Sequence, residues 1–252
     1  MFKVLSWNCQ GAAKKRSSRT FRELVSIHKP GVAIIMKPRV SGGKAARIIR
    51  RLRFSHSHRI EARSFAGGIW LLWNEYHVQV QVLYNHTQIL HVRVTKARDS
   101  FLLSTVYASP QAGWRNYCWR NIEALSQEIT EPWLLVGDFN AILEGLERKD
   151  RLGRQGKANV AFQQCIFEAK LIDLGSNCGD FTWKRAGDQA RLDHFLCNDA
   201  WRIKNTEAAV THLPYTCSDH RPILIKEGLP HPQEREGLSG SKPILENIIV
   251  GH

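Results

Sequence analysis

The stretch PWLLVGDFN at residues 132–140 decides the fold of this chain. Its apolar run, entered through a proline and left through a glycine, is typical of a strand that is buried on both faces. Asp138 and Asn140 stand two residues apart, so an extended backbone would point both side chains to the same side. An isolated Gly-Asp-x-Asn is also typical of a plain turn. A carboxylate and an amide at the mouth of a buried strand are costly unless they bind something, so we expect a site here.

The composition is that of a folded protein. The chain has 252 residues, of which 43% are hydrophobic, with 8 Trp and 10 Phe, and this argues against disorder. Neither an internal linker nor a repeat interrupts the pattern. We therefore predict one domain over residues 1–228, followed at 229–252 by a loosely ordered tail rich in Pro, Gly, Ser and charge.

The charge and the cysteines restrict the possible partners and the compartment. Lys and Arg number 36 against 23 Asp and Glu, and the formal net charge of +13 is typical of proteins with polyanionic partners such as nucleic acid. The charge alone is equally compatible with a generally basic soluble protein. Neither a signal peptide nor an apolar run of membrane-spanning length is visible, so we predict an intracellular protein without a membrane partner. The 6 cysteines lack zinc-ligand spacing, which predicts reduced core thiols.

Strand and helix patterns alternate in both halves of the chain, with consecutive strands between them. Strands are predicted at residues 2–8, 32–36, 69–73, 77–83, 89–94, 101–107, 191–196 and 223–225, and helices near 21–28, 48–52, 118–129 and 162–169. The short connections between residues 69 and 107 predict antiparallel pairing there. The polar, basic loop at 144–157 is long enough to face a substrate. This order predicts an α/β sandwich of two sheets covered by helices.

Polar side chains stand at the ends of these strands, namely Asn8, Lys37, Tyr107, Asp138, Asn140, Thr182, Asp193, Asp219 and His220. Their order resembles the endonuclease/exonuclease/phosphatase superfamily, which includes deoxyribonuclease I and the abasic-site endonucleases. Within it, GGIWLLW at 67–73, FTW at 181–183 and RLDH at 191–194 resemble the endonuclease domains of plant LINE-type retrotransposons. The resemblance covers residues 1–228. It implies a DNase I-like fold, a four-layer α/β sandwich of two mixed, largely antiparallel sheets flanked by helices.

The resemblance also implies catalytic roles. His220, in the Ser-Asp-His motif, would be the catalytic imidazole, and Asp193 would orient it and raise its pKa. Asp138 would position or deprotonate the attacking water, and Asn140 would hold that water. The dipeptide of Asp219 and His220 would by itself be a turn more often than a site, so the argument depends on the whole set.

Further residues would bind substrate and metal. By the same resemblance, Asn8 and Tyr107 would bind phosphate oxygens, and Thr182 would donate a hydrogen bond near the scissile group. Asp219 would hold Mg²⁺, or Mn²⁺ in its place, together with Asn8. Taken alone, Tyr107 is more often a core tyrosine and Asn8 a loop cap.

One position departs from the family pattern. Where the family has a glutamate as the principal ligand of Mg²⁺, this chain has Lys37, and the nearby Gln10 supplies no replacement charge. Mg²⁺ requires oxygen ligands and usually one or two carboxylates. At an effective dielectric constant of about 20, a like charge at roughly 4 Å costs on the order of 4 kcal/mol. We therefore expect metal binding and cleavage to be weakened.

Three functions remain open on the sequence. The first is an endonuclease of LINE origin that nicks DNA and leaves a 3′ hydroxyl, with Lys37 either disabling it or standing in for part of the metal's charge. The second is a phosphatase or phosphodiesterase acting on a small phosphate ester. The third is a catalytically dead nucleic-acid-binding remnant. We predict DNA as the partner, no obligate protein partner, and a nuclear location that the basic run at 14–16 supports weakly.

Overall fold

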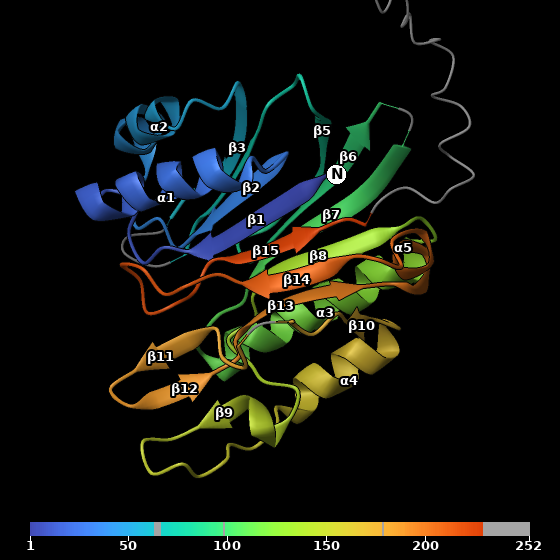
Figure 1. Ribbon diagram of the computed structural model, residues 1–252. Helices are drawn as coiled ribbons and strands as arrows, with labels where there is room; N and C mark the ends of the chain where they lie inside the picture. The colour runs from blue at the N-terminus through green and yellow to red at the C-terminus, as the bar shows by residue number, and fades with distance from the viewer. Residues whose placement is uncertain (63–66, 98, 178, 229–252) are drawn as a thin grey trace, which may run out of the picture.

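A computed structural model describes residues 1–62, 67–97, 99–177 and 179–228 of the chain (Figure 1). The predicted tail at 229–252 lies outside the described residues. No helix within the described ranges has the length and apolar character needed to span a bilayer.

Two six-stranded sheets face each other across the middle of the molecule. The first has the order β14-β15-β1-β2-β4-β3, with β1 (Lys3–Asn8), β2 (Val32–Met36), β3 (His56–Ile60), β4 (Ile69–Trp73), β14 (Ala209–His212) and β15 (Ile223–Lys226). The second has the order β10-β13-β8-β7-β6-β5, with β5 (Gln79–Asn85), β6 (Ile89–Lys96), β7 (Asp99–Tyr107), β8 (Trp133–Asp138), β10 (Ile172–Asp173) and β13 (Asp193–Cys197). Within the described residues, the pairs β1/β2 and β7/β8 are parallel, and all other strand pairs of these two sheets are antiparallel.

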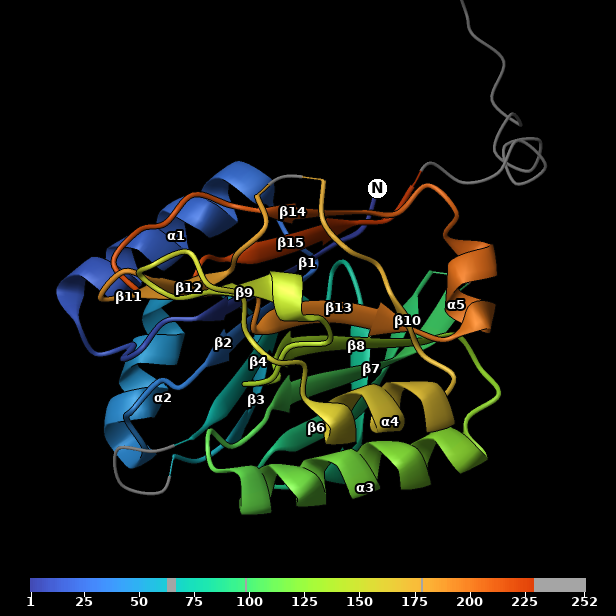
Figure 2. The ribbon, with the colours of Figure 1, turned by 90° about the horizontal axis from the view of Figure 1, so that it is seen from below.

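Helices cover the outer face of each sheet (Figure 2). The first sheet carries α1 (Lys15–His28) and α2 (Gly42–Arg51), and the second carries α3 (Ala112–Glu128) and α4 (Val160–Glu168). The short helix α5 (Asp199–Lys204) follows β13. A small third sheet of β11 (Trp183–Arg185), β12 (Asp188–Ala190) and β9 (Arg148–Lys149) lies beyond, with the 3₁₀ helix η1 (Gly145–Glu147). The predicted α/β sandwich is confirmed.

The pleat of the buried strands builds the layers. Along β8, Leu134 and Val136 enter the core between the two sheets, whereas Trp133 and Leu135 pack against the helices α3 and α4. Gly137 is required on this strand because a Cβ there would lie 1.8 Å from the Val106 carbonyl oxygen. The apolar run at residues 133–136 is therefore buried on both faces, as its sequence predicts.

Some predicted elements were wrong in detail. Strand β4 pairs with β2 and β3 in the first sheet, whereas β5 belongs to the second, so this connection changes sheets instead of forming a hairpin. Strand β5 begins at Gln79 and ends at Asn85, two residues later than predicted. The loop at 144–157 contains η1 and β9. The sequence analysis also missed β3 and α5, which are short.

The cysteines agree with the prediction as far as they are described. Cys9, Cys118, Cys165 and Cys197 are buried free thiols, and Cys217 is a partly exposed one. Cys178 lies outside the described residues.

Candidate active site

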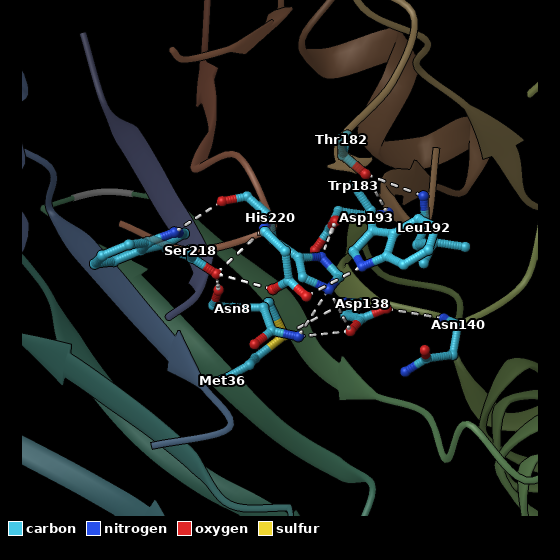
Figure 3. Close-up of polar contacts among 12 residues, drawn as sticks. Asn8, Met36, Asp138, Asn140, Thr182, Trp183, Leu192, Asp193, Ser218 and His220 are labelled. Atoms are coloured by element: carbon cyan, nitrogen blue, oxygen red, sulfur yellow. Dashed lines mark hydrogen bonds and ion pairs between the residues drawn. The ribbon is translucent and has the colours of Figure 1, made fainter. Parts of the chain in front are cut away.

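Strand ends from both sheets meet at one edge of the sandwich (Figure 3). Asn8 ends β1 and Asp138 ends β8. Asp193 begins β13 and stands opposite Asp138 in the antiparallel register, and Tyr107 ends β7 opposite Asp138 in the parallel register. His220 arrives from the segment before β15. Five residues distant in sequence are thus brought together by strand pairing within each sheet and by the packing of the two sheets.

The centre of this site is a buried group of two carboxylates and one imidazole, which we call the relay cluster: Asp138, Asp193 and His220. Their exposed fractions are 1%, 1% and 3%. His220 Nδ1 lies 2.8 Å from Asp193 Oδ2, and His220 Nε2 lies 3.8 Å from Asp138 Oδ2. Asn8 Nδ2 donates to Asp138 Oδ2 at 2.7 Å and lies 3.3 Å from His220 Nε2. The imidazole therefore lies between two carboxylates, with one nitrogen directed at each.

Burial and charge act against each other on the pKa values of the relay cluster. Burial lowers the pKa of His220, but the negative charges of Asp193 and Asp138 outweigh it and raise that pKa to about 9. Burial raises the pKa of Asp138 to about 6, although the neighbouring His220 opposes this shift. At neutral pH the imidazole thus carries a proton, and the Asp138 carboxyl titrates close to neutrality.

Neighbouring groups hold the relay cluster in place. Thr182 Oγ1 accepts the backbone N–H groups of Leu192 and Asp193, each at 3.0 Å. Ser218 Oγ donates to the Asn8 carbonyl at 2.7 Å and accepts the His220 N–H at 3.1 Å. Thr182 is fully buried, and its two hydrogen bonds to Leu192 and Asp193 position the start of β13; the predicted hydrogen bond near the scissile group stays a prediction. The sequence analysis missed Ser218, although it belongs to the quoted Ser-Asp-His motif.

Asn140 does not lie beside Asp138 on the pleat, and that expectation was wrong. Strand β8 ends at Asp138, and Asn140 adopts a left-handed backbone with φ +47°. Its N–H donates to Asp138 Oδ1 at 3.0 Å, while its side-chain amide donates to the Ala108 carbonyl at 2.8 Å. Asn140 therefore contacts the carboxylate through its backbone, and its side chain points away from His220 (Figure 3).

The remaining predicted residues surround the relay cluster. Asp219 is half-buried, and its Oδ2 accepts the Trp183 indole N–H at 3.3 Å. Tyr107 is buried, and burial together with the Asp138 charge raises the pKa of its hydroxyl. Tyr107 and Lys37 also line an open cavity of about 650 Å³.

The surroundings of Lys37 do not fit the Mg²⁺ site that the sequence analysis expected here. Lys37 is half-buried, and burial and the Arg39 charge lower its pKa, while Asp138 and Asp219 raise it. Asn8 Oδ1, the nearby amide oxygen, already accepts the Gln10 N–H at 3.3 Å. An ammonium thus stands among the groups that would supply oxygen ligands, contrary to what Mg²⁺ requires. We therefore assign no chemical step to a metal at this position.

Two groups of acidic and histidine side chains among the described residues have ligand atoms close enough to hold a metal ion. One is the relay cluster. The other, which the sequence analysis missed, is Glu147, Asp173 and His194, and we call it with Arg191 the clamp cluster. Arg191 pairs with Glu147 at 2.8 Å and also with Asp173, so the clamp cluster already contains a cation of its own.

Comparisons with known proteins identify a family and similar folds. The model of the Endonuclease/Exonuclease/phosphatase family matches residues 5–220. No curated protein matches the chain significantly. Solved structures with a similar fold include the endonuclease domain of TRAS1, a telomere-specific non-LTR retrotransposon, at 16% identity and a TM-score of 0.66, covering 90% of this chain and 97% of that one.

Two further structures are similar in fold. The AP endonuclease LMAP from Leishmania major shares 13% identity at a TM-score of 0.71, with 92% of this chain and 88% of that chain covered. The 3′ phosphatase NExo from Neisseria, bound to a product DNA hairpin, shares 14% identity at a TM-score of 0.67, with 91% and 100% covered.

Proposed function

Because the chain belongs to the endonuclease/exonuclease/phosphatase family, we propose that it is a DNA-directed phosphodiesterase of retrotransposon endonuclease type, with a cleavage rate reduced by Lys37. The observation that carries this proposal is the relay cluster, a buried imidazole between two carboxylates with an amide beside it. Such an arrangement provides a base and a proton-bearing group at one phosphate.

The chemistry follows from the positions of the side chains. Asp138, whose pKa is about 6, accepts a proton from a water molecule as the water oxygen bonds to phosphorus. The bond from phosphorus to the 3′ oxygen breaks, and that oxygen takes up a proton from solvent to become a 3′ hydroxyl. The His220 imidazolium stabilises the negative charge that develops on the phosphoryl oxygens, and Asp193 holds the imidazole in place. Asn8 and Tyr107 bind the same phosphate.

DNA is the proposed substrate because of the net charge of the chain and its similarity in fold to proteins that act on DNA. The formal net charge of +13 favours a polyanion over a small phosphate ester. Among the similar folds are a retrotransposon endonuclease domain and a phosphatase bound to a DNA product. The similarity to these two structures is one of fold, and it supports the proposal.

The test is nicking of supercoiled plasmid in Mg²⁺ and in Mn²⁺ by the native chain, Lys37→Glu and His220→Ala. We expect slow or undetectable nicking by the native chain. Lys37→Glu should nick at a rate about 100-fold higher or more, because the repulsion between the lysine ammonium and a divalent cation, on the order of 4 kcal/mol, is removed. Nicking by the native chain that His220→Ala leaves unchanged would contradict the proposal.

The alternative is a module that binds nucleic acid without cutting it, and Lys37 favours this reading. It predicts salt-dependent DNA binding with no nicking by either the native chain or Lys37→Glu. Hydrolysis of a small phosphate ester, with plasmid left intact, would instead indicate a phosphatase of the same family.

A further inference from the structure

A cavity lies beside the relay cluster, and the proposed chemistry uses only Tyr107 of its lining. Its volume of about 650 Å³ falls within the range of about 300–1,000 Å³ that is typical of small-molecule sites. It is lined by Lys37 and Arg39 on one side and by Tyr107 and Trp114 on the other. Because Tyr107 stands opposite Asp138 in the register of β7 and β8, the cavity adjoins the position of the reacting phosphate.

One wall of the cavity is cationic. Lys37 and Arg39 flank Pro38, with φ values of +50° and +53°, and Arg39 Nη2 donates to Gln10 Oε1 at 2.7 Å. Within the described residues neither cation forms an ion pair. The acidic lining residue Glu61 is engaged with Arg59 at 2.7 Å. The wall therefore favours an anion such as a phosphate group.

The opposite wall offers an aromatic ring to solvent. Trp114, in the first turn of α3, is 63% exposed, and its ring lies 5.7 Å from that of Tyr117. The buried Gln88 holds the segment before and at this turn, because its Nε2 donates to the Trp114 carbonyl at 2.9 Å and its Oε1 accepts the Ser109 N–H at 2.6 Å. The backbone that carries the exposed indole is thus fixed, as a stacking platform for a base requires.

We propose that this cavity binds one unpaired nucleotide of the DNA strand next to the scissile phosphate. Lys37 and Arg39 bind the phosphate of that nucleotide, and Trp114 stacks on its base. The inference rests on the proposed function, since it places a substrate nucleotide beside the relay cluster. It also gives Lys37 a role in binding DNA without a divalent cation.

The experiment measures equilibrium binding by fluorescence anisotropy in EDTA, with a labelled DNA hairpin that carries one bulged nucleotide and the same hairpin fully paired. The variants are Trp114→Ala and Arg39→Ala. Tyr76→Ala removes an aromatic ring beyond the far end of β4 that is 94% exposed, against 63% for Trp114, and Arg22→Ala removes an exposed cation of α1. These two variants serve as controls for Trp114→Ala and Arg39→Ala.

We expect Trp114→Ala to weaken binding of the bulged hairpin about 5- to 30-fold, as loss of one base stack does, with little effect on the paired hairpin. Arg39→Ala should weaken binding of the bulged hairpin and reduce the slope of its salt dependence by about 1, as loss of one phosphate contact does. The two controls should bind like the native chain. Equal binding of the bulged hairpin by Trp114→Ala and the native chain would overturn the inference and leave the proposed function standing. Failure of every chain, native included, to bind either hairpin would overturn both.

Discussion

Strand β13 contributes neighbouring residues to two clusters that look alike in composition and differ in electrostatics. Asp193 belongs to the relay cluster and His194 to the clamp cluster, because the pleat sends adjacent side chains to opposite faces of the sheet. Each cluster contains two carboxylates and one histidine, and the ligand atoms of each lie close together.

The difference lies in how completely the carboxylates are paired. In the clamp cluster, Asp173 accepts from Arg191, from the Gly175 N–H and from His194, and these contacts overcome its burial and lower its pKa to about 2. In the relay cluster, Asp193 Oδ1 is buried and has no hydrogen-bond partner within the described part of the chain.

The two clusters therefore differ in how much hydrogen-bonding capacity their carboxylates have left. In the clamp cluster, Arg191 pairs with the carboxylates of both Glu147 and Asp173. The cluster therefore connects η1, β10 and the start of β13 through ion pairs. A cluster with an unpartnered carboxylate oxygen and a carboxyl that titrates near neutrality retains unused binding capacity.

The strongest test is to remove each histidine. His220→Ala should lower the rate of plasmid nicking about 10²- to 10⁴-fold, both in the native chain and in the Lys37→Glu background, because the proton-bearing group at the phosphate is lost. His194→Ala should destabilise the fold and leave the rate per folded molecule within a few-fold, because its ring packs edge-on against both Phe139 and Phe162. Equal losses of nicking rate in the two variants would contradict the assignment of different roles to the two clusters.

The next effect concerns the arginine that distinguishes the clusters. Arg191→Ala should lower the free energy of unfolding by about 3–5 kcal/mol, because it leaves two carboxylates whose side chains are only 13% and 16% exposed without their cation. Urea denaturation followed by circular dichroism measures the change. Arg154→Ala, which breaks an exposed pair with Asp150 at 2.6 Å, is the control and should cost less than about 1 kcal/mol. A similar cost for both would show that Arg191 contributes no more to stability than an exposed ion pair does.

The two clusters should also give stability opposite dependences on pH. The pKa of His220 rises from 6.5 to about 9 on folding, so its contribution is complete below pH 6.5 and is lost as the pH rises through 9. The pKa of Asp173 falls from 3.8 to about 2, so its contribution is complete above pH 3.8 and is lost as the pH falls through 2. Each contribution is on the order of 2–3 kcal/mol.

Denaturation at a series of pH values checks this prediction. His220→Asn should flatten the stability profile between pH 6.5 and 9, and Asp173→Asn should flatten it between pH 3.8 and 2. A profile that keeps its alkaline slope in His220→Asn would mean that another group is responsible for that slope.

The smallest expected change in stability concerns Thr182. Thr182→Val should lower the free energy of unfolding by about 1–3 kcal/mol, since the N–H groups of Leu192 and Asp193 lose their acceptor. Thr182→Ser keeps the hydroxyl and should restore most of the stability. A large loss of nicking in Thr182→Val at unchanged stability would instead place Thr182 in contact with substrate.

Much of the fold could be predicted because buried strands have a local signature. The apolar runs that became β2, β4 and β8 are buried along their whole length, so their composition alone marks them. The short strand β3 and the six-residue helix α5 lack such a signature, since one is half exposed and the other makes fewer than two turns. The change of sheet between β4 and β5 is a matter of long-range pairing, which no local pattern encodes.

The amino-acid sequence by itself determined which chemical groups stand at strand ends, the ammonium of Lys37 among them, because residue identity and strand periodicity are local properties. Only the tertiary structure decided which of these groups meet. Asn140 turns its side chain toward the Ala108 carbonyl, Thr182 supports the backbone of Asp193, and Arg191 joins Glu147 and Asp173 in the clamp cluster. The physical reason is that hydrogen bonding, burial and charge between residues distant in sequence depend on distances that only the folded chain sets.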